Sequence, residues 1–116
     1  MAKPDLKDLS TANEIELTVK GRKSGQEISR PVWFVHEDDK LYLLPVQGSD
    51  TNWYRNVLKN PKVKISAQRK ELSGEVKTIT ETKKVKELVE KFRSKYGNSD
   101  VQNYYSKFDV GVELAL

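Results

Sequence analysis

Cysteine is absent from this chain of 116 residues, so a disulfide framework and a thiolate metal site are both excluded. The single histidine, His36, precedes a run of carboxylates and is expected to be a solvated turn residue rather than a metal ligand. No apolar run approaches the roughly 20 residues that cross a bilayer, and the N-terminus lacks the apolar core of a signal peptide. A cytoplasmic protein without a metal site or an integral membrane segment is therefore expected.

A strong excess of one charge is also missing. The chain has 21 Lys and Arg against 17 Asp and Glu, a formal net charge of +4, and the two signs are interspersed along most of it. Faces that bind nucleic acid usually concentrate their basic residues on one side, so no nucleic-acid partner is expected. The length indicates a single domain over residues 1–116, in which residues 1–13 form a polar N-terminal arm.

The most informative stretch begins with two predicted strands. Ile15, Leu17 and Val19 alternate with polar residues, which is typical of a half-buried strand. A second extended run covers residues 28–35 and contains Pro31. Because proline cannot donate a hydrogen bond to a strand ladder, this second strand is expected at a sheet edge or at a bulge.

Between these strands lies the loop Gly21-Arg22-Lys23-Ser24-Gly25. Its two glycines permit positive φ, so successive backbone N–H groups could line a concavity that holds an anion. Arg22 adds a planar fork of donors, Lys23 a point charge and Ser24 a hydroxyl. The loop therefore predicts a phosphate-binding site, and a solvated basic hairpin loop is the alternative.

The rest of the chain predicts an α+β, mainly β fold. Further strands are expected at residues 40–46, 62–68, 71–80 and 110–116. A short helix is expected between a cap at Asp50 or Thr51 and an end at Asn60-Pro61, and a short helix or irregular turn at 98–107. The one long helix, from 81 or 82 to 96, has an apolar stripe and ends at Gly97, while Gly74 predicts a bend in its strand. About six antiparallel strands with one long and one or two short helices indicate a small antiparallel split β-barrel.

Two ordered motifs resemble the deazaflavin-dependent nitroreductase family, which is related to the split-barrel flavin-binding proteins typified by pyridoxamine phosphate oxidase. One motif is the run 17–25, which ends in GRKSG, and the other is the run 52–57, NWYRNV; Pro31 lies between them and NPKV at 60–63 follows. The resemblance spans roughly residues 14–116. It implies an oxidoreductase that uses the reduced deazaflavin F420 to reduce a quinone, nitro compound or similar small acceptor, and it implies a homodimer.

The resemblance also implies which residues form the site. Six would bind or flank the cofactor: Arg22, Lys23, Ser24, Gly25, Trp53 and Asn56. Tyr105 would be the catalytic residue, because a phenol near the acceptor could stabilise or protonate the oxygen on which charge develops. Tyr104 is the competing candidate, and both rings could instead only cover the open end of the barrel.

The residue types independently suit a hydride-carrying cofactor, which needs from the protein a binding site and no nucleophile. Aromatic walls for its ring are expected from Trp33, Trp53, Tyr54, Tyr104 and Tyr105. The alternative for Trp53 and Tyr54 is that they anchor the short helix to the barrel.

Three positions depart from the family's pattern and leave the substrate open. Gln47 stands where many members have a lysine, Thr51-Asn52 where a proline commonly precedes the Trp-Tyr pair, and Gln102 where a second tyrosine is usual. An FMN-binding reductase or oxidase of the same fold is therefore an alternative.

An alternative of another class is a non-catalytic barrel that binds nucleic acid through Lys20, Arg22, Lys23 and Arg30. It would require further basic residues on the face of the loop: Lys59, Lys62, Lys64, Arg69 and Lys70.

Overall fold

The computed structural model of the protein describes residues 14–37, 40–67 and 70–115, and the expected N-terminal arm lies outside them. Within these ranges the strands are β1 (Ile15–Lys20), β2 (Glu27–Val32), β3 (Phe34–Glu37), β4 (Lys40–Leu43), β5 (Lys62–Ala67), β6 (Lys70–Ile79) and β7 (Gly111–Ala115). The helices are a 3₁₀ turn, η1 (Gly48–Asp50), and α2 (Asn52–Lys59), α3 (Thr82–Tyr96) and α4 (Asn98–Tyr104).

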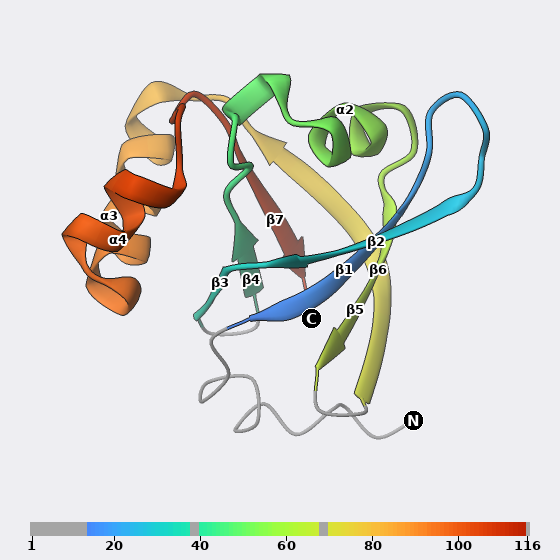
Figure 1. Ribbon diagram of the computed structural model, residues 1–116, viewed down its shortest axis with the longest axis horizontal. Coiled ribbons are helices and arrows are strands. Elements are labelled where there is room, and N and C mark those ends of the chain that lie inside the picture. Colours follow the sequence, from blue (N-terminus) through green and yellow to red (C-terminus); the bar gives the residue numbers. More distant parts are fainter. Residues whose placement is uncertain (1–13, 38–39, 68–69, 116) are drawn as a thin grey trace.

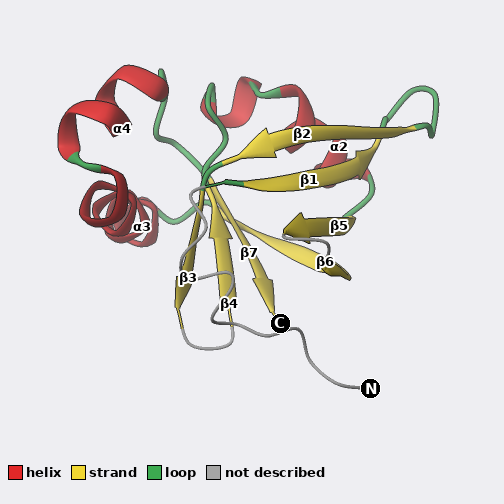
Figure 2. Ribbon diagram, turned by 60° about the horizontal axis from the view of Figure 1, so that its bottom comes forward, coloured by secondary structure: helices red, strands yellow, loops and turns green. Residues whose placement is uncertain are grey.

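The strands form one curled antiparallel sheet in the order β2-β1-β5-β6-β7-β4-β3, which confirms the predicted split barrel. Figure 1 shows α2 over one end of the sheet, with α3 and α4 together beside β3 and β4. In Figure 2 the pair β1–β2 diverges from β3, β4 and β7, so the sheet is folded into two lobes rather than flat.

The run expected as one strand from residue 28 to 35 divides at Trp33. Its first part, β2, pairs only with β1, and its second part, β3, pairs only with β4. The two parts therefore stand at opposite ends of the strand order, and the chain crosses between the lobes at Trp33. The prediction that Pro31 marks an edge strand is confirmed, since it lies in β2 opposite Glu16 and β2 has no other neighbour.

The predicted bend at Gly74 lies where β6 passes from one lobe to the other. β6 pairs with β5 as far as Glu75, which is opposite Lys62, and with β7 from Val76, which is opposite Leu114. A Cβ atom at Gly74 would lie 2.8 Å from the Cδ1 of Leu114, so a side chain there would have to displace the end of the Leu114 side chain.

Two clusters of buried side chains hold the fold together. One fills the curl of the sheet beneath α2, where Leu17, Leu41 and Val112 from the strands join Trp53 and Val57 of the helix. The second lies between the sheet and the helices α3 and α4. It contains the predicted stripe of α3, namely Val85, Leu88, Val89 and Phe92, together with Val101 and Tyr105. The two cores meet near Trp33, and the groove described next opens beside it.

Candidate functional site

A groove of about 650 Å³ opens between β2, the loop 21–25, α2 and the segment that follows α4. Five of the six predicted cofactor residues and Tyr105 line it: Arg22, Lys23, Ser24, Trp53, Asn56 and Tyr105. Gly25 does not line it; its φ of +70° makes the turn of the loop. The structure thus brings together two motifs that are 30 residues apart in the sequence.

We call the loop 21–25 together with Arg30 the basic end of the groove. Arg30 projects from β2, and neither its side chain nor that of Lys23 has a hydrogen bond or ion pair with any residue the structure describes. Among the described lining residues there is no carboxylate. Three cations without a neighbouring anion favour a negatively charged ligand. Arg30 was expected beside Arg22 and Lys23 only in the nucleic-acid alternative and not in the cofactor site, because the sequence of β2 shows no clean alternation that would assign its side chain to one face.

The backbone of the loop is less available to an anion than the sequence suggested. Gly21 N donates to Gln26 O at 2.8 Å, Gly25 N donates to Gly21 O at 2.9 Å, and Gln26 N donates to the hydroxyl of Ser24 at 3.2 Å. Arg22 N is also occupied, because it donates to Asn56 Oδ1 at 3.1 Å. Only the N–H groups of Lys23 and Ser24 are left without a bond in the described part of the loop, so the side chains provide most of its donors.

The opposite end of the groove is formed by Trp33, Tyr104 and Tyr105, which we call the aromatic end. The Trp33 ring stacks on Tyr96 at 4.3 Å between centroids and meets the edge of Tyr104 at 4.2 Å. Tyr105 lies 5.9 Å from Trp33 at a steep angle. Such offset and edge-to-face pairs add packing energy beyond burial, so this end is rigid. Tyr54, expected as a wall, does not line the groove; it is buried in the core beneath α2.

The backbone next to Trp33 is held by the end of α3. The hydroxyl of Tyr96 donates to Phe34 O at 2.9 Å and accepts from Phe34 N at 3.0 Å. Lys95 Nζ also donates to Phe34 O, at 2.8 Å, and lies 3.6 Å from the centroid of the Phe34 ring. Burial lowers the pKa of Lys95 from 10.5 to about 8 and raises the pKa of Tyr96 to about 12. These contacts fix the place where β2 passes into β3.

Tyr105 is buried, with 4% of its surface exposed, although it lines the groove. Burial, with a smaller contribution from Tyr104, raises the pKa of its hydroxyl far above the ordinary value of 10. That hydroxyl makes no hydrogen bond with a residue the structure describes. A protonated phenol without a protein partner can donate to a ligand oxygen. Tyr104 also lines the groove and is half-buried, so the structure does not separate the two candidates by position.

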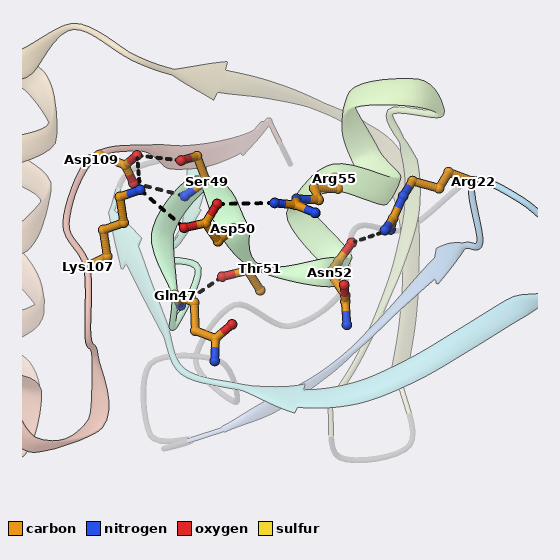
Figure 3. Close-up of polar contacts among 9 residues, drawn as sticks. All are labelled: Arg22, Gln47, Ser49, Asp50, Thr51, Asn52, Arg55, Lys107 and Asp109. Atoms are coloured by element: carbon orange, nitrogen blue, oxygen red, sulfur yellow. Dashed lines mark hydrogen bonds and ion pairs between the residues drawn. The ribbon is translucent and has the colours of Figure 1, made fainter.

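The third side of the groove is the segment 47–52, which is tied to the C-terminal part of the chain (Figure 3). Asp109 accepts from Ser49 N at 2.9 Å and from the hydroxyl of Ser49 at 2.5 Å. Asp50 pairs with Lys107 at 3.3 Å and Arg55 at 3.1 Å, and the hydrogen bond from Lys107, with the charges of both cations, lowers the pKa of Asp50. This network fixes the segment from which Gln47, Thr51 and Asn52 line the groove.

Gly48 shows how closely these two segments approach. Its φ is +55°, and a Cβ atom built there would lie 2.0 Å from Asp109 Oδ1. A side chain at this position would therefore displace the carboxylate that holds Ser49, and glycine is required.

No metal centre is found among the described residues, where no three His, Asp or Glu side chains come together. His36 is half-buried in β3 rather than solvated in a turn, because the strand continues through it to Glu37. No helix in the described ranges is long and apolar enough to cross a membrane.

The basic cluster that a nucleic-acid site would need is not assembled at the groove. Lys62 and Lys64 line a separate depression of about 370 Å³, and Lys64 is paired with Glu27 at 3.4 Å. Lys59 donates to Arg22 O at 2.9 Å without lining the groove. Arg69 and the side chain of Lys70 are not among the parts of the chain that the structure describes.

The chain has a split-barrel fold with a groove beside β2 and α2. By sequence, the chain belongs to the family described as "Uncharacterized protein conserved in bacteria (DUF2255)", whose model matches residues 5–110. No curated protein matches it.

Solved structures are similar to this one at low identity. An F420-H2 dependent reductase (FDR-A) is 20% identical with a TM-score of 0.68, over 88% of this chain and 93% of that one. A putative pyridoxamine 5'-phosphate oxidase from Listeria innocua is 17% identical with a TM-score of 0.71, over 95% and 88%. The heme storage protein HutZ from Vibrio cholerae is 11% identical with a TM-score of 0.72, over 94% and 84%. At these identities the likeness shows the shared fold alone.

Proposed function

We propose that the groove binds F420 and that the protein is a reductase, which transfers a hydride from the reduced cofactor to a quinone, nitro compound or similar small organic acceptor. The observation that carries this proposal is the polarity of the groove. Arg22, Lys23 and Arg30 line one end with no carboxylate among the described lining residues, and Trp33, Tyr104 and Tyr105 line the other. The similarity in fold to an F420-H2 dependent reductase supports it.

The residues present suit such a cofactor in charge and in polarity. The basic end would hold its phosphate and acidic tail, because cations bind these groups through charge-assisted hydrogen bonds. Val32, Leu44 and Trp53, together with Trp33 of the aromatic end, give the groove an apolar lining, which would receive the ring. When bound, the reduced deazaflavin supplies a hydride, so the protein itself needs no nucleophile or metal.

Tyr105 would act on the acceptor. Its raised pKa keeps the proton on Oη at neutral pH, so the hydroxyl would donate a hydrogen bond to the acceptor oxygen as negative charge develops there. The same raised pKa makes Tyr105 a poor proton donor, and the proton that completes the reduction would come from water through the open side of the groove. Tyr105 is thus proposed as a stabilising donor.

FMN is the alternative cofactor, since its single phosphate could be held by the same cations. The decisive experiment is a titration of the purified full chain with F420 and, separately, with FMN. Trp33 and Trp53 are the two tryptophans of the sequence and both line the groove, so intrinsic fluorescence should be quenched on binding. Saturable quenching by F420 is expected, and turnover is then measured with a quinone and a nitroarene as acceptors. The absence of saturable binding by either cofactor would contradict the proposal.

The homodimer is likewise a proposal, which rests on the family resemblance. Light scattering of the purified chain should give twice the mass of 13.3 kDa. A mass of one chain at micromolar concentration would contradict it.

A further inference from the structure

Arg22 is held by one face of α2. Asn56 Oδ1 accepts from Arg22 N at 3.1 Å and from Arg22 Nη1 at 2.9 Å, and the carbonyl of Asn52 accepts from the same Nη1 at 3.5 Å. Lys59 Nζ donates to Arg22 O at 2.9 Å. Asn52, Asn56 and Lys59 are spaced at i, i+4 and i+7, which places them on one side of the helix. One helix therefore engages the N–H, the C=O and the guanidinium of a single loop residue.

Asn56 is unusual in its burial. It has 4% of its surface exposed and is the one buried polar side chain among the described residues. A buried amide costs free energy unless its polar atoms are bonded, and asparagine is not a strong helix former. Both partners of its Oδ1 are donors, so the two bonds from Arg22 satisfy the buried oxygen. The bonds to Arg22 therefore explain how a buried asparagine is tolerated in α2.

The loop needs such support. Gly21 and Gly25 leave its backbone with many accessible conformations. When an anion binds an unordered loop, the entropy lost in ordering the loop weakens the affinity. The backbone hydrogen bonds Gly21 N to Gln26 O and Gly25 N to Gly21 O close the loop at its base, and Gln26 N donates to the Ser24 hydroxyl at 3.2 Å. Contacts from α2 to Arg22 add an anchor near its middle.

We propose that Asn56 and Lys59 are positioning residues, which hold Arg22 and thereby order the loop 21–25 before an anionic ligand binds. The Oδ1 of Asn56 is used by its two bonds to Arg22, so through this atom Asn56 affects a ligand only by holding Arg22. The Nδ2 of Asn56 has no hydrogen bond with described residues and is the atom left for a ligand. The effect on affinity rests on the proposed function. The ordering of the loop is a property of the free protein and can be measured without a ligand.

The first test compares Asn56→Leu, which keeps the size of the side chain, with Asn56→Asp, which keeps an acceptor for Arg22. Hydrogen exchange of the backbone amides is measured on the full chain without ligand. The informative amides are those of Gly21 and Gly25, because their acceptors lie within the loop and not on α2. We expect exchange at both to quicken about tenfold or more in Asn56→Leu, and to return close to the original rate in Asn56→Asp.

The second test uses Lys59→Met, because Lys59 is exposed and does not line the groove. We expect the same change in exchange, together with an affinity for F420 about tenfold weaker. In turnover, the KM for reduced F420 should rise while kcat is unchanged, since the aromatic end is intact. General damage to the fold would lower kcat as well.

Exchange that quickens only at Arg22 in Asn56→Leu, with Gly21 and Gly25 unchanged, would overturn the proposal. If Asn56→Leu fails to fold, Lys59→Met alone is decisive. An exchange rate at Gly25 and an affinity for F420 that are both unchanged in Lys59→Met would then overturn the proposal. Should the original chain bind neither F420 nor FMN while loop exchange responds as expected, the ordering by α2 would be supported and the proposed function would fail.

Discussion

The two ends of the groove are built in different ways. The basic end consists of the exposed Lys23 and Arg30 and the half-buried Arg22, on a loop and an edge strand, and among the described residues it is tied to the rest of the fold by the bonds from α2 to Arg22. The aromatic end is part of the second core, where Tyr105 packs against Phe92 at 6.0 Å and Trp33 stacks on Tyr96. Lys23 and Arg30, which have no hydrogen bond or ion pair with described residues, can change with little effect on the fold. Changes at the second end alter the site and the stability together, unless they remove a single polar atom.

The largest effect is expected from Tyr105→Phe, which removes only the hydroxyl at the aromatic end. Turnover should fall about a hundredfold, because a donor to the developing negative charge is lost. The affinity for F420 should be unchanged, and so should the melting temperature, since that hydroxyl has no partner among the described residues. Steady-state kinetics and thermal unfolding are the measurements. Tyr104→Phe is the matched control, and a loss of turnover in that variant alone would transfer the role to Tyr104.

At the basic end, Lys23→Ala should weaken F420 binding about ten- to a hundredfold. A charge-assisted hydrogen bond contributes about 1.5–3 kcal/mol, and Lys23 has no competing partner in the described structure. Stability should not change, because the side chain is exposed. Fluorescence titration gives the affinity, and circular dichroism checks the fold. Lys62→Ala, an exposed lysine outside the groove, serves as the control; equal losses in both variants would mean that only net charge matters.

Trp33→Leu tests whether the aromatic end is structural. It removes the stack on Tyr96 and the edge contact with Tyr104, so the free energy of unfolding should fall by about 2 kcal/mol. Ile28→Ala removes an apolar side chain from β2 that is 37% exposed, and should cost less than about 1 kcal/mol. Urea unfolding measures both. Similar losses would show that the two ends do not differ in the way described.

The smallest effect concerns pH and Lys95, beneath the aromatic end. Its pKa is lowered by burial to about 8, against 10.5 when unfolded. Between these values the unfolded chain binds more protons, so stability from this side chain should rise as pH increases above about 8. Below about pH 8 the full penalty for burying the charge is present. The buried tyrosines, with raised pKa, oppose this gain above about pH 10.

Urea unfolding between about pH 8 and 9.5 should therefore show a rise in stability that Lys95→Met lacks. Identical slopes in the two proteins would mean that Phe34 O and the Phe34 ring hold the ammonium fully charged in the folded state.

Much of the fold could be predicted from local patterns. The alternation of Ile15, Leu17 and Val19 places them on the buried face of β1, and the stripe of α3 packs as expected. Gly97 ends that helix with a φ of +95°, and the edge position of β2 follows from Pro31. These features depend on the periodicity and backbone freedom of neighbouring residues, which a sequence displays directly.

The sequence determined which residue types are available for the site. The tertiary structure decided which of these residues contact one another. The loop motif identified Arg22 and Lys23, but the bond from Arg22 to Asn56 joins residues 34 positions apart. The division of the run 28–35 into two strands at Trp33 could not be predicted from the sequence. An apolar run has the same pattern of residues whether it stays in one part of a sheet or crosses between two lobes. Such outcomes depend on strand register and on which faces pack together, and these are decided by the whole folded chain rather than by any local segment.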